Sequence, residues 1–139
     1  MYYHTRSVGP DVDALKAAFK KCGEIAKNNG FKEVGLAVPT TGNLDGVIND
    51  VIGEEATRLL LKDKKLVLKG LTIHLITKRI KPRRFSGPIL AVYTPIEQTK
   101  EIAKSAYCKG LVYVPWTDDE APKFEKTFKS NVFYEMNKK

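Results

Sequence analysis

A chain of 139 residues, 42% of them hydrophobic and 29% charged, has the size and composition of one globular domain that needs no disulfide or metal to complete its core. No apolar run reaches the ~18 residues of a membrane helix, and the N-terminus lacks the apolar segment of a secretory signal. We therefore expect a single cytoplasmic α/β domain over residues 1–139, not anchored in a membrane. The chain has 24 basic and 16 acidic residues, and residues 62–84 contain nine of the basic residues and one of the acidic ones. The net charge of +8 is therefore concentrated in this segment, and the other residues are balanced in charge.

The first half of the chain predicts two helices on either side of a short strand. His4 is expected to lie in an N-terminal tail. Residues 11–29 are predicted to form a helix, because apolar residues recur in steps of three and four. The apolar run 33–39 predicts a buried strand. Residues 44–61 carry a broad apolar stripe and predict a second helix, although two glycines interrupt it.

The second half alternates strands and helices. The β-rich run 65–79 is too long for one strand, so we expect a break at Gly70 with residues 71–77 as the main strand. The further predicted elements are a strand (87–94), a helix (95–109), a strand (110–116), a helix (118–130) and an edge strand (131–136). This layout resembles that of Rossmann-like, doubly wound folds. It predicts a three-layer α/β domain with a mostly parallel sheet of four or five strands.

In such sheets, ligands usually lie beyond the carboxyl ends of the strands. The turn after the first buried strand is therefore a candidate anion site, in which hydroxyl, amide and backbone groups would face a phosphate: Thr40, Thr41, Gly42 and Asn43. The alternative is that Asn43 only caps the following helix. Neither a Gly-x-x-x-x-Gly-Lys-Ser/Thr loop nor a Gly-x-Gly-x-x-Gly loop is present, so no cofactor is assigned.

Two further loops combine threonine and acids at predicted helix starts. Thr94 and Glu97 match a capping box, as do Thr117 and Glu120. The second of these loops also contains Asp118 and Asp119, and paired carboxylates can hold Mg²⁺ or transfer protons. Its alternatives are therefore helix capping, favoured by the helix dipole, a metal-assisted hydrolase site, or a partner contact.

The densest basic stretch predicts a surface for a polyanion. Its five cations are Lys78, Arg79, Lys81, Arg83 and Arg84, and arginine pairs with phosphate through two parallel hydrogen bonds. Phe85 beside them is a candidate for stacking on a base. The alternatives are a solvated loop, an acidic protein partner or a small phosphorylated ligand.

The remaining reactive residues have structural interpretations. His74 lies in mid-strand and is expected to be a hydrogen-bonded sheet histidine. Cys22 and Cys108 are expected to be free thiols within helices. The sequence therefore predicts a small binding domain for an anionic ligand, either a nucleotide at the Thr40 turn or a nucleic acid on the basic stretch. A hydrolase at residues 118–120 and a non-catalytic accessory module are the alternatives.

Overall fold

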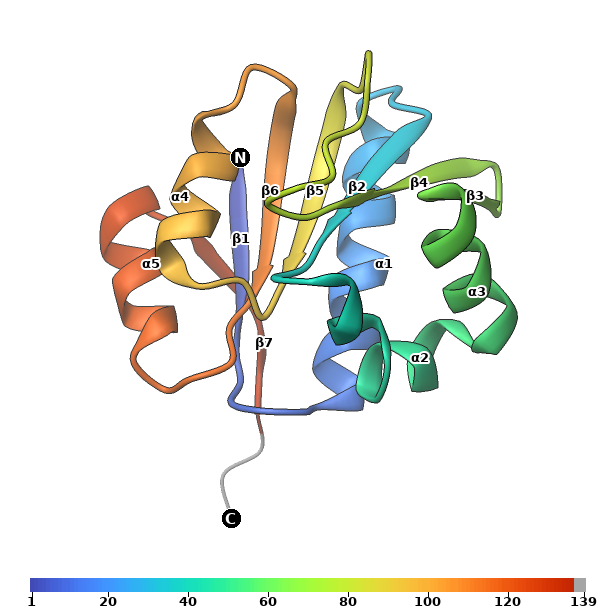
Figure 1. Cartoon of the computed structure of the whole chain (residues 1–139). Coiled ribbons are helices and arrows are strands. Elements are labelled where there is room, and N and C mark those ends of the chain that lie inside the picture. The colour runs from blue at the N-terminus through green and yellow to red at the C-terminus, as the bar shows by residue number, and fades with distance from the viewer. Residues whose placement is uncertain (137–139) are drawn as a thin grey trace.

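The computed structural model describes residues 1–136 and shows a mixed α/β protein built on a seven-stranded, mostly parallel sheet (Figure 1). The spatial order of the strands is β3-β4-β2-β5-β6-β1-β7, and only the pairing of β3 with β4 is antiparallel. The strands are β1 (Tyr2–Arg6), β2 (Glu33–Ala37), β3 (Lys65–Leu68), β4 (Leu71–Ile76), β5 (Gly87–Val92), β6 (Cys108–Val114) and β7 (Asn131–Glu135).

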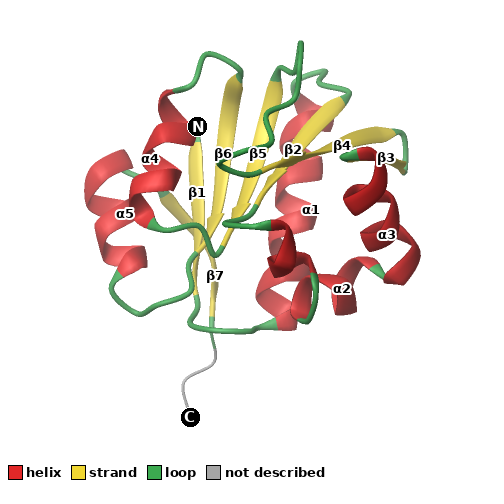
Figure 2. Cartoon of the chain, viewed as in Figure 1, coloured by secondary structure: helices red, strands yellow, loops and turns green. Residues whose placement is uncertain are grey.

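Helices pack on both faces of this sheet (Figure 2). They are α1 (Val12–Asn28), α2 (Val47–Ile52), α3 (Glu54–Asp63), α4 (Ile96–Lys104) and α5 (Glu120–Phe128). Alternate strand residues feed two buried clusters. Leu36 and Leu90 join the cluster under α1 to α3, whereas Ala37 and Ile89 join the cluster under α4 and α5. The central strands are thus apolar on both faces, as expected for parallel strands covered on both sides.

The sheet exceeds the expected four or five strands partly because the N-terminal segment is not a tail. Residues 2–6 form β1, which pairs in parallel with β6 and β7 in the interior of the sheet. His4 is fully buried there, so its assignment to a tail was wrong. The strand has two aromatic residues followed by three polar ones and no polar–apolar alternation, so its sequence does not distinguish it from a tail.

The predicted helix over residues 44–61 is broken at both of its glycines. A single 3-10 turn (Thr41–Leu44) precedes α2, and α3 follows separately. Gly46 and Gly53 have φ of 81° and 92°, which helical residues do not adopt. The chain therefore bends twice here, and α2 is only six residues long.

The β-rich run does break at Gly70, but it folds back as a hairpin. Lys69 and Gly70 have φ of 51° and 80°, the left-handed values of a two-residue hairpin turn. β4 spans Leu71–Ile76, one residue shorter than the main strand predicted over residues 71–77. The antiparallel return brings Lys64 to the carboxyl end of β4, where its carbonyl accepts a hydrogen bond from the Leu75 amide at 2.9 Å.

Two smaller local predictions were also wrong. Cys108 begins β6 rather than ending a helix, although both cysteines are free. Thr94 does not cap α4: its buried hydroxyl lies 2.6 Å from that of Thr99. Glu97 stays exposed beside Lys100. Within residues 1–136, no helix is long and apolar enough to cross a membrane.

Candidate functional site

The two ends of the parallel strands differ in charge. α1, α4 and α5 run back from the carboxyl ends of the strands toward their amino ends, and each begins with an acid and ends with a lysine in its outer turns. This arrangement complements the helix dipole. The loops that follow β1, β2 and β6 add further acids at the carboxyl end, namely Asp11, Asp45, Asp118 and Asp119, whereas the loop that follows β4 brings Lys78 and Arg79 there.

Additional cations lie at the amino ends of four adjacent strands. Lys69 precedes β4, Lys32 precedes β2, Arg83 and Arg84 precede β5, and Lys109 is the second residue of β6. Since β4, β2, β5 and β6 are consecutive in the sheet, this row is about 14 Å wide at ~4.8 Å per strand. We call these five residues the basic rim. All five are exposed, and none pairs with a carboxylate of residues 1–136.

The basic loop, residues 77–86, runs from one end of the sheet to the other (Figure 1). Its first turn is held by Thr77, whose hydroxyl accepts hydrogen bonds from the amides of Arg79 and Ile80 at 3.1 and 3.0 Å. Its last residues enter β5, where Gly87 lies so close to the carbonyl oxygen of Glu33 that a Cβ would approach it to 2.3 Å. The structure therefore separates Lys78, at the carboxyl end, from Arg83 and Arg84, at the amino end.

A small cavity of about 140 Å³ lies between this loop and α4. Lys78 and Lys81 line it from the loop, and Gln98 and Glu101 line it from α4. Gln98 is buried; its amide nitrogen donates to the carbonyl of Val38 at 3.3 Å, whereas its Oε1 has no partner among residues 1–136. The lining also includes apolar side chains such as Ile76 and Ile102, so it is mixed in character, and the cavity has room for a few waters.

Phe85 is not available to stack on a nucleic-acid base. Its side chain is 5% exposed and packs edge-on against His74 and Tyr107, with ring centroids 5.3 and 5.9 Å away. The stacking prediction was therefore wrong. Phe85 anchors the end of the basic loop in the core under α4, and the five charged side chains of the loop remain exposed.

The Thr40 turn uses its own polar groups. Asn43 Oδ1 accepts hydrogen bonds from the backbone amide and the hydroxyl of Thr40, at 3.0 and 2.9 Å. The amide of Asn43 donates in return to the carbonyl of Thr40 at 3.1 Å. Thr41 and Gly42 complete this closed turn. A phosphate at this position would have to displace these internal bonds.

An aromatic pair at the carboxyl end was not found from the sequence. Tyr93, directly after β5, has φ of 62°, a left-handed value that costs energy for a residue with a bulky side chain. Its ring meets that of Trp116 edge-on at 4.7 Å, and Trp116 is 45% exposed. The buried hydroxyl of Tyr93 has no hydrogen-bond partner in the described part of the chain, and burial raises its pKa. An unfavourable backbone angle leaves no signal in a single sequence.

The acidic loop is largely occupied by its own hydrogen bonds. The carboxylate of Glu120 accepts the amides of Trp116 and Thr117 at 2.8 and 2.9 Å, which forms one half of the predicted capping box. Asp119 pairs with Lys123 at 2.8 Å, and this lysine together with the Thr117 hydroxyl lowers the pKa of Asp119 to about 2. In residues 1–136, no group of three or more potential metal ligands gathers here or elsewhere.

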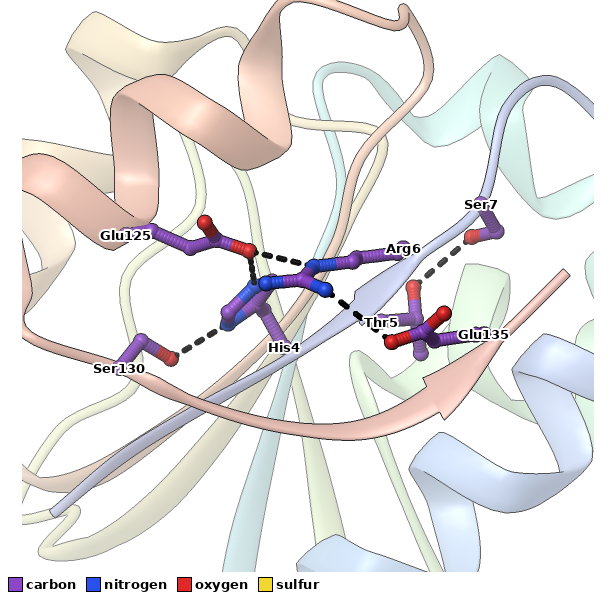
Figure 3. A network of polar contacts seen from close by, with 7 residues as sticks. All are labelled: His4, Thr5, Arg6, Ser7, Glu125, Ser130 and Glu135. Atoms are coloured by element: carbon purple, nitrogen blue, oxygen red, sulfur yellow. Dashed lines mark hydrogen bonds and ion pairs between the residues drawn. The ribbon is translucent and has the colours of Figure 1, made fainter.

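A polar network centred on the buried His4 joins β1 to the C-terminal elements (Figure 3). His4 Nδ1 lies 2.7 Å from the Ser130 hydroxyl, and His4 Nε2 lies 2.7 Å from Glu125. Arg6 donates to the same carboxylate at 2.7 Å and to Glu135 at 3.1 Å. Burial lowers the pKa of His4 although Glu125 acts to raise it. A neutral imidazole donates from Nε2 and accepts from the serine, the tautomer a general base requires.

The His4 network nevertheless lacks access for a substrate. His4 is fully buried, and the cavity between the basic loop and α4 is not lined by His4, Ser130 or Glu125. We therefore interpret the network as a structural link between β1, α5 and β7. The prediction for His74 is confirmed: its Nε2 lies 2.8 Å from Glu33 Oε1.

Comparison with known proteins adds no functional assignment. No protein-family model matches the chain, and no curated protein or solved structure matches it either. The function therefore has to be argued from the charges, cavities and contacts described above.

Proposed function

We propose that this protein is a small binding domain for an anionic ligand, and that the ligand is the phosphate backbone of a nucleic acid. In this proposal Arg83 and Arg84 are the central contacts. The rest of the basic rim continues the contact along the amino end of the sheet, and Lys78, Arg79 and Lys81 continue it along the basic loop. A nucleic acid fits better than a single phosphate group because the rim extends across four strands.

The observation that carries this proposal is that the rim cations have no structural role of their own. Helix-dipole preferences explain the lysines in the last turns of α1, α4 and α5, but the rim residues lie outside helices. They form no ion pairs within residues 1–136. Keeping like charges side by side and exposed without partners costs energy, which a polyanion would recover by releasing its counterions.

Salt dependence of binding tests the proposal. If all five rim cations contact duplex phosphates, the logarithm of the association constant should fall against the logarithm of the salt concentration with a slope of about −4.5. Single strands should give about −3.5. Fluorescence anisotropy with labelled DNA and RNA measures both. Absence of salt-sensitive binding to DNA, RNA and heparin would contradict the proposal and favour a non-catalytic accessory module or an acidic protein partner.

A nucleotide at the carboxyl end is the second candidate. We infer a Rossmann-like arrangement, in which the crevice between β2 and β5 would be the usual ligand position. The strained Tyr93, the exposed Trp116 and the Thr40 turn support it, because strained residues cluster at ligand sites. Acids around this end argue against a highly charged ligand. Thermal shifts with phosphate, ATP, GTP, NAD and ADP-ribose test this candidate separately from the basic rim.

A further inference from the structure

A cavity of about 710 Å³ opens on the face of the sheet that α1, α2 and α3 cover. Its volume lies within the ~300–1,000 Å³ typical of small-molecule sites. The sheet forms its floor, α1 and α2 form its walls, and the β3–β4 hairpin closes one side. Side chains that line it include Phe19, Leu36, Ile52, Leu71 and Ile73.

The cavity exists because the cover on this face is incomplete. The break at Gly53 ends α2 after six residues, and α3 packs against β3 instead of continuing alongside α1. On the opposite wall, Gly23 of α1 has no side chain to fill the gap. A Cβ added at Gly23 would be 3.9 Å from Leu71 Cδ1, which is an ordinary contact distance.

The lining is mostly aliphatic, whereas the rim of the cavity is cationic. Among residues 1–136, Phe19 is the only aromatic residue that lines it, and no carboxylate does. Lys16 and Lys20 lie one turn apart on α1, and Lys69 lies in the turn between β3 and β4. None of these three lysines forms an ion pair within the described chain. An occupant should therefore have a flexible apolar body and an anionic head.

We propose that this cavity binds a single-chain anionic amphiphile such as a fatty acid. The alkyl chain lies against the aliphatic floor between α1 and α2, and the carboxylate lies beside Lys16, Lys20 and Lys69. An alkyl chain suits the lining better than a planar aromatic ligand does, because one phenylalanine offers little stacking surface. This inference is independent of the nucleic-acid proposal. Lys69 is the one residue that both of them use.

Calorimetric titration with dodecanoate, below its micelle concentration, tests the inference. The intact protein should bind one equivalent, and dodecyltrimethylammonium, which has the same chain and a cationic head, should bind much more weakly. Equal binding of the two amphiphiles would overturn the assignment of the lysines. Absence of dodecanoate binding would overturn the proposal as a whole.

Two filling variants assign the binding to this cavity. Gly23→Met places a side chain in the gap and improves the helix propensity at an interior position, so the variant should remain folded while dodecanoate binding is lost. Val51→Phe fills the cavity from α2 and should have the same effect on binding. Retention of full binding in both folded variants would place the ligand elsewhere and overturn the proposal.

Charge variants test the head group. Lys16→Gln with Lys20→Gln should weaken dodecanoate binding roughly two- to tenfold, the range for two exposed ionic contacts. The matched control, Lys27→Gln with Lys104→Gln, removes two exposed lysines that do not line the cavity and should leave the affinity unchanged. If both pairs of substitutions weaken binding equally, net charge alone explains the effect, and the assignment of the head group to Lys16 and Lys20 is overturned.

Two further outcomes separate this inference from others. Arg83→Gln with Arg84→Gln should leave dodecanoate binding intact, so failure of nucleic-acid binding would not affect it. Sedimentation of the wild type should show the same oligomeric state as Gly23→Met. A dimer that Gly23→Met dissociates would instead assign the apolar cavity to a second copy of the chain and would overturn the fatty-acid proposal.

Discussion

The amino and carboxyl ends of the parallel strands differ in how their charged and polar groups are paired. At the carboxyl end, acids cap helices and polar groups satisfy one another, as in the Thr40 turn and the acidic loop. At the amino end, the five residues of the basic rim are exposed and unpaired within residues 1–136. Charges that helix stability explains carry little information about function, whereas the charges that it does not explain are the basis of the proposed polyanion surface.

The largest expected effect is on stability and comes from Gly87, which allows the amino ends of β5 and β2 to approach each other closely. Gly87→Ala should destabilise the fold by about 3 kcal/mol, because the new Cβ would meet the carbonyl oxygen of Glu33 at 2.3 Å and backbone cannot easily yield. Gly35→Ala is the control: its closest contact, at 2.7 Å, is the flexible end of Ile76, so it should cost less. Chemical denaturation measures both. Equal costs would show that β5 and β2 can separate at this end.

The next effect is on nucleic-acid binding by the basic rim. Arg83→Gln with Arg84→Gln should lower the salt slope for duplex DNA by about 2 and the affinity by roughly tenfold or more, since two phosphate contacts are lost. The melting temperature should change little because exposed charges contribute little to stability. Anisotropy titrations measure the slope.

The matched control for that comparison is Lys62→Gln with Lys65→Gln. These lysines come from the same basic segment of the sequence and are exposed, but the hairpin places Lys65 opposite His74, away from the rim. Equal weakening by the two double mutants would show that net charge alone matters and that the amino end has no special role.

A third prediction uses the His4 network, which crosses from β1 to the C-terminal elements. The pKa of His4 is lowered by burial, so between its ordinary value of 6.5 and its folded value the unfolded chain binds more protons. Stability should therefore fall as the pH drops below about 6.5. Hydrogen bonds from Arg6 and His4 lower the pKa of Glu125, which adds a further loss below about pH 4.5.

Thermal unfolding across this pH range measures the effect. His4→Gln should be less stable at neutral pH and should show a flatter dependence between pH 6.5 and 5, because the titrating group is gone. Glu135→Gln removes an exposed partner of Arg6 and should keep the wild-type slope. An unchanged slope in His4→Gln would assign the acid sensitivity to other groups.

A smaller effect is expected at the Thr40 turn. Asn43→Ala removes the acceptor of two hydrogen bonds and should cost about 1 kcal/mol, as loss of a helix cap does. If the turn also binds phosphate, a ligand at 100 times its Kd should stabilise the wild type by about 2.7 kcal/mol and the variant by less. Equal thermal shifts in both proteins would place any anion site elsewhere.

The smallest effect is expected from the acidic loop. Asp118→Asn with Asp119→Asn should leave phosphodiesterase and phosphatase screens with Mg²⁺ and Mn²⁺ as blank as those of the wild type, because Asp119 is paired with Lys123 and no group of three or more potential metal ligands gathers here within residues 1–136. Turnover by the wild type that this double mutant abolishes would establish the hydrolase alternative and reverse the comparison between the two ends.

The sequence by itself determined the local properties of the chain. Apolar runs such as residues 33–39 and 87–94 predicted buried strands, and amphipathic stretches between them predicted helices on both faces. Residues 62–84 carried the whole charge excess, and Gly70 marked the break in a long β-rich run. These features depend on neighbouring residues, so periodicity and turn chemistry reveal them.

Only the tertiary structure decided which residues meet. His4 is buried because Ser130 and Glu125, 126 and 121 positions away, close over it. Phe85 is removed from the surface by packing against Tyr107, and the hairpin and basic loop send cations of one sequence segment to opposite ends of the sheet. The physical reason is that the strand order and the direction of each crossover determine where a loop emerges. Both depend on long-range strand pairing, which the local sequence pattern does not encode.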